Sequence, residues 1–591
     1  METKDTLNKK IESLPKGYVT KKKINGKIYY YHQWKEGNKT KSYTIHEDEV
    51  PYLKEKIEER KQLKKELKSL EQIPVGNENT IETDLNALTG NALKNMIHMA
   101  DGMEARDCFS KLEQYVFEKS IDKVCLLYGL RRTGKTMMIR QVISKMTNEQ
   151  FEKTVYIKAS QKDTMASLNK DLKKYVGNGY QYIFIDEVTL ISDFIDGASL
   201  FSDVYAAQGI KVILSGTDSL GFYFASNEEL YDRTVLIHTT FISYKEHSRL
   251  LKIQNIDEYI RYGGTLKAGE LDFEREDASF KDDESTRRYI DTAICKNIQH
   301  SLKCYEEGSH FRHLKALYNV DELTNAINRI IQDINHDFTI QVITKDFVSR
   351  DLKSSAQMLR KAKKEENRST VLDEIDTEDV IYRLMKILDI YNQSDLKEEI
   401  TESVVYEIKE YLQALDLIEN VTIRSSIMNE DDLEHIIFTQ PGMRYCQAQA
   451  LVYSLMQNRE FNELSEREKN LISTKILEDV KGIMLEDIVL LETKKYIEPY
   501  KSVFKLLFAY GEFDMVIYDS KMDSCEIYEI KHSNQQVDLQ WKNIMDENKI
   551  QFTQKKYGKI TKRCVLYTGK SCILEDGREY KNVEEYLKEL Y

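Results

Sequence analysis

The sequence predicts an α/β protein with a parallel-sheet core, a helical middle region and a second α/β domain at the C-terminus. Residues 123–238 alternate apolar, strand-like runs with helical stretches. This alternation is typical of a parallel sheet with helices on both faces. Residues 241–450 are mostly helical in pattern, and residues 465–591 return to mixed helix and strand. At 591 residues, the chain has room for about three to five domains.

The composition excludes several classes of protein. Hydrophobic residues make up 41% and charged residues 31%, with a net charge of −13, so the chain as a whole is not a basic coat for nucleic acid. No run approaches about 18 apolar residues, and the charged start METKDTLNKK lacks an apolar signal core, so we expect no membrane span. The eight cysteines form no CxxC pair, which favours reduced thiols and a cytoplasmic location.

Residues 1–75 are expected to form a small basic module. Between residues 15 and 46, short aromatic and β-branched runs are separated by the turn signals NGK and EGNK, which predicts a three-stranded meander. A charged helix follows, with Leu and Ile at steps of three and four residues. A basic, Tyr-rich module can bind nucleic acid, but a solvated accessory domain explains the same residues, and both interpretations stay open. Residues 76–99 are predicted to be a linker.

A phosphate-binding loop is predicted in the stretch YGLRRTGKTMMI, inside a core placed at residues 100–245. The pattern GxxxxGKT follows the apolar run KVCLLY and opens the helical stretch MMIRQVI, which is the context that this motif requires. Lys135 is expected to reach the β- and γ-phosphates of ATP, and the Thr136 hydroxyl to bind Mg²⁺. The predicted ATP-binding residues are Gly129, Leu130, Arg131, Arg132, Thr133, Gly134, Lys135 and Thr136.

The second half of a nucleotide-hydrolysing site is predicted in YIFIDEV. Asp186 ends this apolar run and would hold the Mg²⁺ shell, and Glu187 would polarise the attacking water. Ser215 and Thr217, at the end of the next strand, are candidates to sense the γ-phosphate. Arg233 precedes the last strand and could reach a phosphate in the same chain or in a neighbouring subunit of a homo-oligomer, but an ordinary surface arginine is an equal alternative.

These motifs resemble a known family. The stretches GLRRTGKT, IFIDEV, ILSGTDS and DRTVLIHTTFISYKEH are similar to those of bacterial and archaeal AAA-type ATPases that pair a P-loop core with a C-terminal domain. The resemblance covers roughly residues 100–591. It implies ATP hydrolysis, a helical lid or insert, placed at residues 246–375, and a restriction-endonuclease-like domain at residues 456–591. Residues 376–455 look like a winged-helix region, with DLIENVTI as the wing strand.

The C-terminal residues can be interpreted independently of the family. Phosphodiester hydrolysis uses Mg²⁺ held by carboxylates, together with a nearby cation. Glu529 and Lys531 are two apart and share one strand face, and Asp514 lies on the preceding strand. This is the D…ExK pattern of PD-(D/E)XK nucleases, in which Asp514 and Glu529 would bind metal and Lys531 would act on water or phosphate. Glu486, from an upstream helix, would complete the metal ligands, with Asp487 as the competing choice.

Two functions of different classes remain open on the sequence alone. The first is an ATPase coupled to Mg²⁺-dependent binding or cleavage of DNA by the C-terminal domain. The second is a regulatory ATPase switch or scaffold whose C-terminal domain binds nucleic acid or a protein partner without cleaving it, because a Glu–Lys pair two residues apart is also common on strand surfaces. In both cases the expected cofactors are ATP and Mg²⁺.

Overall fold

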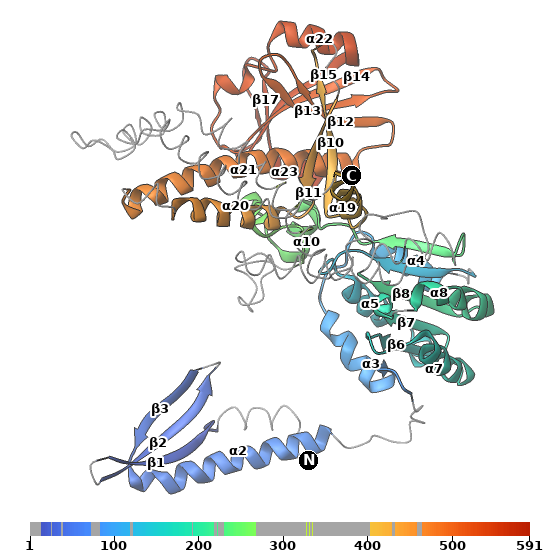
Figure 1. The fold of residues 1–591 in the computed structure, drawn as a ribbon, viewed down its shortest axis with the longest axis vertical. Coiled ribbons are helices and arrows are strands. Elements are labelled where there is room, and N and C mark those ends of the chain that lie inside the picture. Colours follow the sequence, from blue (N-terminus) through green and yellow to red (C-terminus); the bar gives the residue numbers. More distant parts are fainter. Residues whose placement is uncertain are drawn as a thin grey trace. The chain divides into compact units, whose positions relative to one another are not determined.

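The computed structural model describes two compact units, Met1–Glu82 and Thr83–Tyr591, which are treated separately below (Figure 1). The described residues are 14–24, 27–36, 39–71, 83–118, 122–191, 193–217, 222, 230–266, 327, 330, 334, 402–427, 432–457 and 464–590. Within these ranges, no helix is both long enough and apolar enough to cross a lipid bilayer. Most of the predicted lid at 246–375 and the start of the predicted winged-helix region fall outside the described residues.

The N-terminal unit contains the predicted meander and helix. Strands β1 (Tyr18–Ile24), β2 (Lys27–Glu36) and β3 (Lys39–Ile45) form an antiparallel sheet, and α2 (Val50–Glu71) follows. The buried His32 ring donates a hydrogen bond to the Lys16 carbonyl at 2.6 Å. Gly17 has a φ of +97°, and a Cβ there would lie 1.9 Å from the Gln33 carbonyl oxygen, so the chain needs glycine where it enters the sheet.

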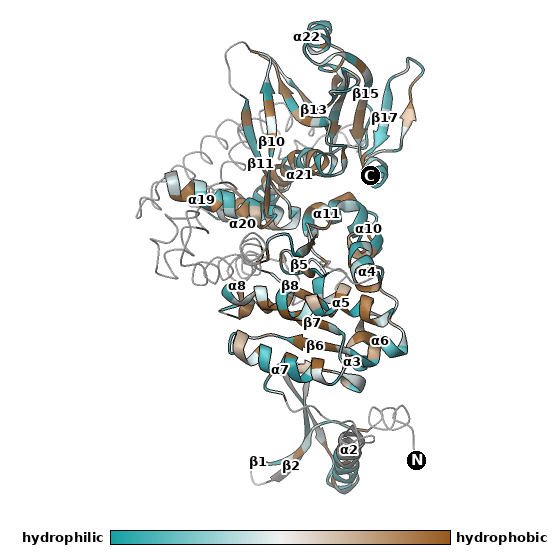
Figure 2. Ribbon diagram, turned by 90° about the vertical axis from the view of Figure 1, so that its right-hand side faces the viewer, coloured by the Kyte–Doolittle hydropathy of each residue, from teal (hydrophilic) through white to brown (hydrophobic). Residues whose placement is uncertain are grey.

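The first sheet of the larger unit has six strands in the order β4-β6-β7-β8-β5-β9. These strands are β4 (Ala87–Leu88), β5 (Val124–Tyr128), β6 (Thr154–Lys158), β7 (Tyr182–Asp186), β8 (Lys211–Gly216) and β9 (Thr234–His238). All neighbours are parallel except β4 and β6. The central strands are almost fully buried and largely hydrophobic (Figure 2), as expected for a parallel sheet covered on both faces.

Helices connect the strands of this sheet. They are α3 (Gly90–Ile97), α4 (Phe109–Phe117), α5 (Lys135–Ser144), α6 (Asn148–Glu152), α7 (Met165–Gly177) and α8 (Phe194–Gly197). The predicted linker at 76–99 is wrong in its second half, because β4 joins the sheet and α3 buries Leu93 completely. Burying the apolar side chains of β4 and α3 removes them from water, which stabilises the folded segment more than leaving it as a solvated linker.

The second sheet has eight strands in the order β11-β10-β12-β13-β14-β15-β17-β16. They are β10 (Ile418–Ser425), β11 (Leu433–Phe438), β12 (Lys501–Leu507), β13 (Glu512–Asp519), β14 (Ser524–Lys531), β15 (Lys559–Tyr567), β16 (Cys572–Ile573) and β17 (Glu579–Asn582). Its helices are α19 (Glu402–Ala414), α20 (Pro441–Met456), α21 (Glu466–Tyr496), α22 (Glu547–Tyr557) and α23 (Val583–Glu589).

This topology corrects the predicted boundary at residue 455. The stretch DLIENVTI contributes to β10, which pairs in parallel with β12 and antiparallel with β11. The hairpin of β10 and β11 is therefore an extension of the C-terminal sheet and not the wing of a separate domain. The prediction failed because a helix followed by a strand and a turn has the same local pattern in both arrangements, and only the pairing partner, about 80 residues away, distinguishes them.

Two short helices connect the halves of the larger unit. Helices α10 (Tyr244–Leu251) and α11 (Ile256–Tyr262) follow β9. Phe241, Tyr244 and Tyr259 are buried in one hydrophobic cluster with residues of α20, α21 and the second sheet. The segment that leaves the first sheet therefore packs into the hydrophobic core of the second sheet.

Candidate nucleotide and metal sites

The predicted phosphate loop runs from the end of β5 to the start of α5. Gly129 has a φ of +144° and Gly134 a φ of +93°, a region open to glycine at little cost. A Cβ on Gly129 would lie 2.4 Å from the Thr239 carbonyl oxygen. The buried Lys135 ammonium donates to the carbonyls of Gly129 and Leu130, both at 2.8 Å. The loop therefore curls around Lys135, and burial lowers the pKa of that lysine to about 8.

Asp186 connects the loop to the neighbouring strands. Its carboxylate accepts hydrogen bonds from the Thr136 hydroxyl at 2.9 Å and from the Tyr156 hydroxyl at 2.8 Å, and a short one from the Ser215 hydroxyl. The structure thus brings together Thr136 and Asp186, the two residues predicted to hold Mg²⁺. The Ser215 hydroxyl contacts Asp186, and its predicted role as a γ-phosphate sensor stays a prediction.

Glu187 follows Asp186 in a left-handed conformation, with a φ of 58°. The Thr217 hydroxyl donates to its carboxylate at 3.4 Å. Burial raises the pKa of Glu187, while the nearby Lys135 opposes this shift. A carboxylate with a raised pKa is a better proton acceptor, which suits the predicted role of Glu187 towards water. This strained backbone conformation lies at the carboxyl end of β7. It holds the Glu187 carboxylate close enough to Lys135 of the phosphate loop for their charges to interact.

Arg233 lies at the end of the strands opposite to the phosphate loop. It precedes β9, and its carbonyl accepts a hydrogen bond from Val124 at the beginning of β5, whereas the phosphate loop follows the end of β5. Its guanidinium forms an ion pair with Asp203, and both side chains are about half exposed. The structure therefore does not bring Arg233 to the phosphate loop of its own chain. A contact with the nucleotide of a neighbouring subunit stays a prediction.

Two residues near the loop were not anticipated from the sequence. The buried Arg106 donates to the Thr133 carbonyl of the loop at 2.6 Å. Burial and the neighbouring cations Lys495, Lys135 and Arg106 lower the pKa of His238 to about 4, so this ring is neutral, and it stacks on Tyr128 with a centroid distance of 4.7 Å. No local pattern marks either residue, because Arg106 precedes the core motif and His238 ends an ordinary apolar strand.

The comparison with protein families finds a match for residues 122–248. These residues match the family model of the AAA domain, and they contain the loop, the Asp186–Glu187 pair and the last strand described above. This part of the chain is an AAA domain. It is a P-loop, nucleotide-binding ATPase domain, as the sequence motifs predict.

Other comparisons add little to the AAA domain. The comparison with curated proteins finds no match. Among solved structures, the chain is similar to that of the Orc1 protein of Aeropyrum pernix in complex with DNA. The identity is 14%, the alignment covers 63% of this chain and 98% of that one, and the TM-score is 0.22. A likeness at this TM-score carries no weight for fold or function.

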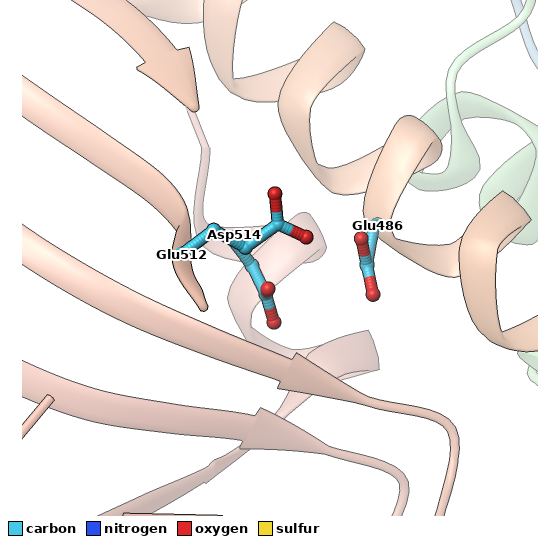
Figure 3. Close-up of side chains that lie close together, drawn as sticks. All are labelled: Glu486, Glu512 and Asp514. Carbon is cyan, nitrogen blue, oxygen red and sulfur yellow. The ribbon is translucent and has the colours of Figure 1, made fainter. Parts of the chain in front are cut away.

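A group of carboxylates lies near the middle of the second sheet, at the end where β13 begins and β14 finishes. Ligand oxygens of Glu486, Glu512 and Asp514 all lie within 4.8 Å of one another. Glu486 comes from α21, and the other two come from the start of β13 (Figure 3). We call these three residues the carboxylate group. Oxygen ligands at this spacing suit Mg²⁺ or another hard divalent cation.

Glu529 and Lys531 border the carboxylate group from β14. The β13–β14 ladder pairs Met515 with Tyr528, so Asp514 and Glu529 come one step further along. The Lys531 ammonium contacts Asp514 at 3.1 Å and Glu529 at 3.0 Å. The amide of Ile530 donates to Asp514 at 2.7 Å. The predicted triad of Asp514, Glu529 and Lys531 is thus brought together. Glu512, which was not predicted, joins the oxygens that could hold a metal ion, and the metal-binding role of Glu529 stays a prediction.

The charges in this region are not balanced. Lys505 contacts Glu486 at 2.7 Å. Burial raises the pKa of Glu486 to about 7 and that of Glu529 to about 8, and Asp514 adds to both shifts. One carboxylate oxygen of Glu529 is buried without a hydrogen-bond partner. Crowded, buried carboxylates are stabilised by an added cation, so the donor set fits a divalent metal ion.

The choice between Glu486 and Asp487 is decided by their partners. The Asp487 carboxylate lies 2.8 Å from Arg444 and 2.6 Å from His435, and all three side chains are largely buried. Asp487 therefore belongs to an ion-paired network with β11 and α20. Glu512 could have been found from the stretch GEFDMV, because residues two apart on a strand share a face. Lys505 carries no such signal.

Proposed function

We propose that this chain is an ATP-hydrolysing AAA-type protein whose C-terminal domain is a Mg²⁺-dependent nuclease acting on DNA. The observation that supports it most strongly is the carboxylate group of Glu486, Glu512 and Asp514 with Lys531 beside it. The AAA domain alone explains nucleotide binding. It does not explain why carboxylate oxygens and a lysine come together on β13, β14 and α21 of the second sheet.

In the AAA domain, each named residue has a chemical role. Lys135 exchanges its contacts with the loop carbonyls for the β- and γ-phosphates when ATP binds. Thr136 and Asp186, which are in hydrogen-bond contact, would hold Mg²⁺. Glu187 would accept the proton of the water that attacks the γ-phosphorus, and the bond to the β–γ bridging oxygen breaks as ADP leaves.

In the C-terminal domain, Glu486, Glu512 and Asp514 would hold Mg²⁺. The ion, when bound, supplies an acidic water and neutralises charge on the scissile phosphate. Lys531, held between Asp514 and Glu529, would stabilise the negative charge that develops on the non-bridging oxygens of the scissile phosphate. Glu529, whose carboxylate contacts Lys531, would accept the proton of the attacking water in its ionised form. One P–O bond forms, and the bond to the departing sugar oxygen breaks.

The proposal is tested by a cleavage assay on single-stranded, duplex and branched DNA with Mg²⁺ or Mn²⁺, with and without ATP. We expect the wild-type protein to cleave at least one of these substrates and Asp514→Asn to be inactive. Asp519→Asn is the matched control on the same strand, because Asp519 only accepts backbone hydrogen bonds in the following turn. Equal inactivity of wild type, Asp514→Asn and Asp519→Asn on every substrate would contradict the nuclease.

A second function, a regulatory ATPase whose C-terminal domain binds a partner without cleavage, is favoured by one observation. Lys505 and Lys531 already contact Glu486 and Asp514, so part of the negative charge is neutralised within the chain. Calorimetry distinguishes the two functions. A scaffold predicts no divalent cation at the carboxylate group, and the nuclease predicts a cation that Asp514→Asn removes.

A further inference from the structure

We propose that the buried pair Arg106–Glu246 positions the phosphate loop and transmits its nucleotide state through α10 and α11 to α21 and β14, two of the three elements that carry the acidic site of Glu486, Glu512, Asp514, Glu529 and Lys531. This inference rests on the proposed function for its consequence, the gating of a nuclease site, but its physical basis is a set of contacts in the larger unit.

The first link connects the loop to α10. Arg106 donates to the Thr133 carbonyl at 2.6 Å, two residues before Lys135. The same guanidinium makes two parallel hydrogen bonds with the Glu246 carboxylate, at 2.8 and 2.9 Å. Both side chains are almost fully buried. A bidentate pair of this kind fixes direction as well as distance, so a shift of the loop carbonyl changes the position of α10.

The loop has a reason to shift when a nucleotide binds. Lys135 is held by two carbonyls of the loop itself, and a phosphate competes for the same ammonium. The Thr133 hydroxyl donates to the Leu130 carbonyl at 2.7 Å and contacts the Thr239 hydroxyl at 2.8 Å. Releasing Lys135 therefore alters the segment that is also bonded to Arg106 and to the end of β9.

The second link connects α10 to α21, the helix that carries Glu486. The backbone amide of Tyr244 donates to Glu492 at 2.6 Å, and the Ser243 and Tyr496 hydroxyls lie 2.9 Å apart. Lys495 donates to the Thr240 hydroxyl at 2.8 Å. Glu492 is six residues after Glu486 on one continuous helix, about 9 Å along its axis. A rigid helix carries a displacement over this distance without loss.

The third link connects α11 to β14, the strand that carries Lys531. The His532 ring lies 2.9 Å from the Asp257 carboxylate of α11. Because His532 is adjacent to Lys531, this contact bears directly on the lysine between Asp514 and Glu529. Helices α10 and α11 are consecutive, so one short segment is linked to the phosphate loop through Arg106 and contacts both α21 and the residue after β14.

Hydrogen exchange measures this coupling without requiring cleavage, so an inactive nuclease site would leave the test intact. In the wild-type protein, saturation with a non-hydrolysable ATP analogue is expected to change amide exchange in residues 486–496 and 524–532 by about fivefold or more. In the double variant Arg106→Met with Glu246→Leu, the change in both segments should vanish. Replacing both partners by apolar residues avoids leaving a buried charge unpaired.

Two controls keep the test decisive. Arg249→Gln alters the same helix α10, where Arg249 contacts Ala105 and Asp107 but not the phosphate loop, and it should respond as the wild type does. Asp257→Asn alters a half-exposed contact. It should keep the response in residues 486–496 and lose it in residues 524–532. A wild-type protein without a response, or a double variant with the full response at saturating analogue, would overturn the proposal.

Discussion

The phosphate loop and the carboxylate group both concentrate charged side chains, but they differ in how those charges are satisfied. In the loop, Lys135 is bonded to carbonyls of its own chain, and Asp186 accepts hydrogen bonds from hydroxyls of three different elements. In the carboxylate group, acidic side chains lie close together, and one carboxylate oxygen of the neighbouring Glu529 is buried without a hydrogen-bond partner. The polar groups of the loop have hydrogen-bond partners before a ligand binds. The carboxylate group instead brings acidic side chains close together, and a bound cation would neutralise their charge.

The largest effect is expected at Lys135. Lys135→Ala removes the ammonium from the phosphates and should lower ATP turnover by at least about 100-fold. Steady-state ATP hydrolysis measures this. Lys145→Ala is the control at the end of the same helix, where Lys145 pairs with Glu113 on the surface, and it should retain the wild-type rate. A wild-type rate in Lys135→Ala would contradict the assignment of the loop.

Substitutions of the adjacent residues Glu486 and Asp487 should have different effects: one should weaken metal binding and the other should lower the unfolding free energy. Asp487→Asn removes the ion pair between Asp487 and the buried Arg444 and should cost about 3 kcal/mol of unfolding free energy. Glu486→Gln can keep a hydrogen bond with Lys505, so its thermal midpoint should stay close to that of the wild type while Mn²⁺ binding falls. Thermal unfolding and Mn²⁺ titration measure the two effects. The reverse pattern would show that the two carboxylates have been assigned the wrong roles.

The pH dependence of the unfolding free energy should reveal the raised pKa of Glu529 beside the carboxylate group. Glu529 has a pKa of about 8 in the folded chain, above the value of about 4.3 for an unfolded glutamate. The folded state therefore binds the proton more tightly, and the stability contributed by Glu529 is lost as pH rises from about 4.3 through about 8. Thermal midpoints across this range, without divalent cations, should fall less steeply in Glu529→Gln than in wild type. Parallel curves would contradict a raised pKa.

The smallest effect is expected at Arg233. Its partly exposed ion pair with Asp203 should contribute less than about 1 kcal/mol to stability. Arg233 lies at the end of the strands opposite to the phosphate loop. Arg233→Ala should therefore leave ATP hydrolysis unchanged when the protein is dilute. A fall that appears only at high protein concentration would assign Arg233 to a neighbouring subunit. A large fall in the dilute monomer would contradict its place in the fold.

The sequence predicted the two regions unequally, for physical reasons. The phosphate loop is encoded by consecutive residues, 129–136, whose spacing is imposed by the backbone itself, so the motif predicted both the residues and the setting. The carboxylate group is assembled from α21, β13 and β14, and the D…ExK pattern identified Asp514, Glu529 and Lys531 but missed Glu512 and Lys505. Arg106 and Glu246 are 140 residues apart in the chain, so their pairing carries no local signal at all.

The central claim, that the carboxylate group binds a divalent cation of its own, is tested most directly by calorimetric titration of Mn²⁺ without nucleotide. The account predicts a binding site in the wild-type protein that is lost in Glu512→Gln and kept in Asp186→Asn, since Asp186 belongs to the phosphate loop. Absence of binding in the wild type, or binding that survives Glu512→Gln and disappears in Asp186→Asn, would contradict it.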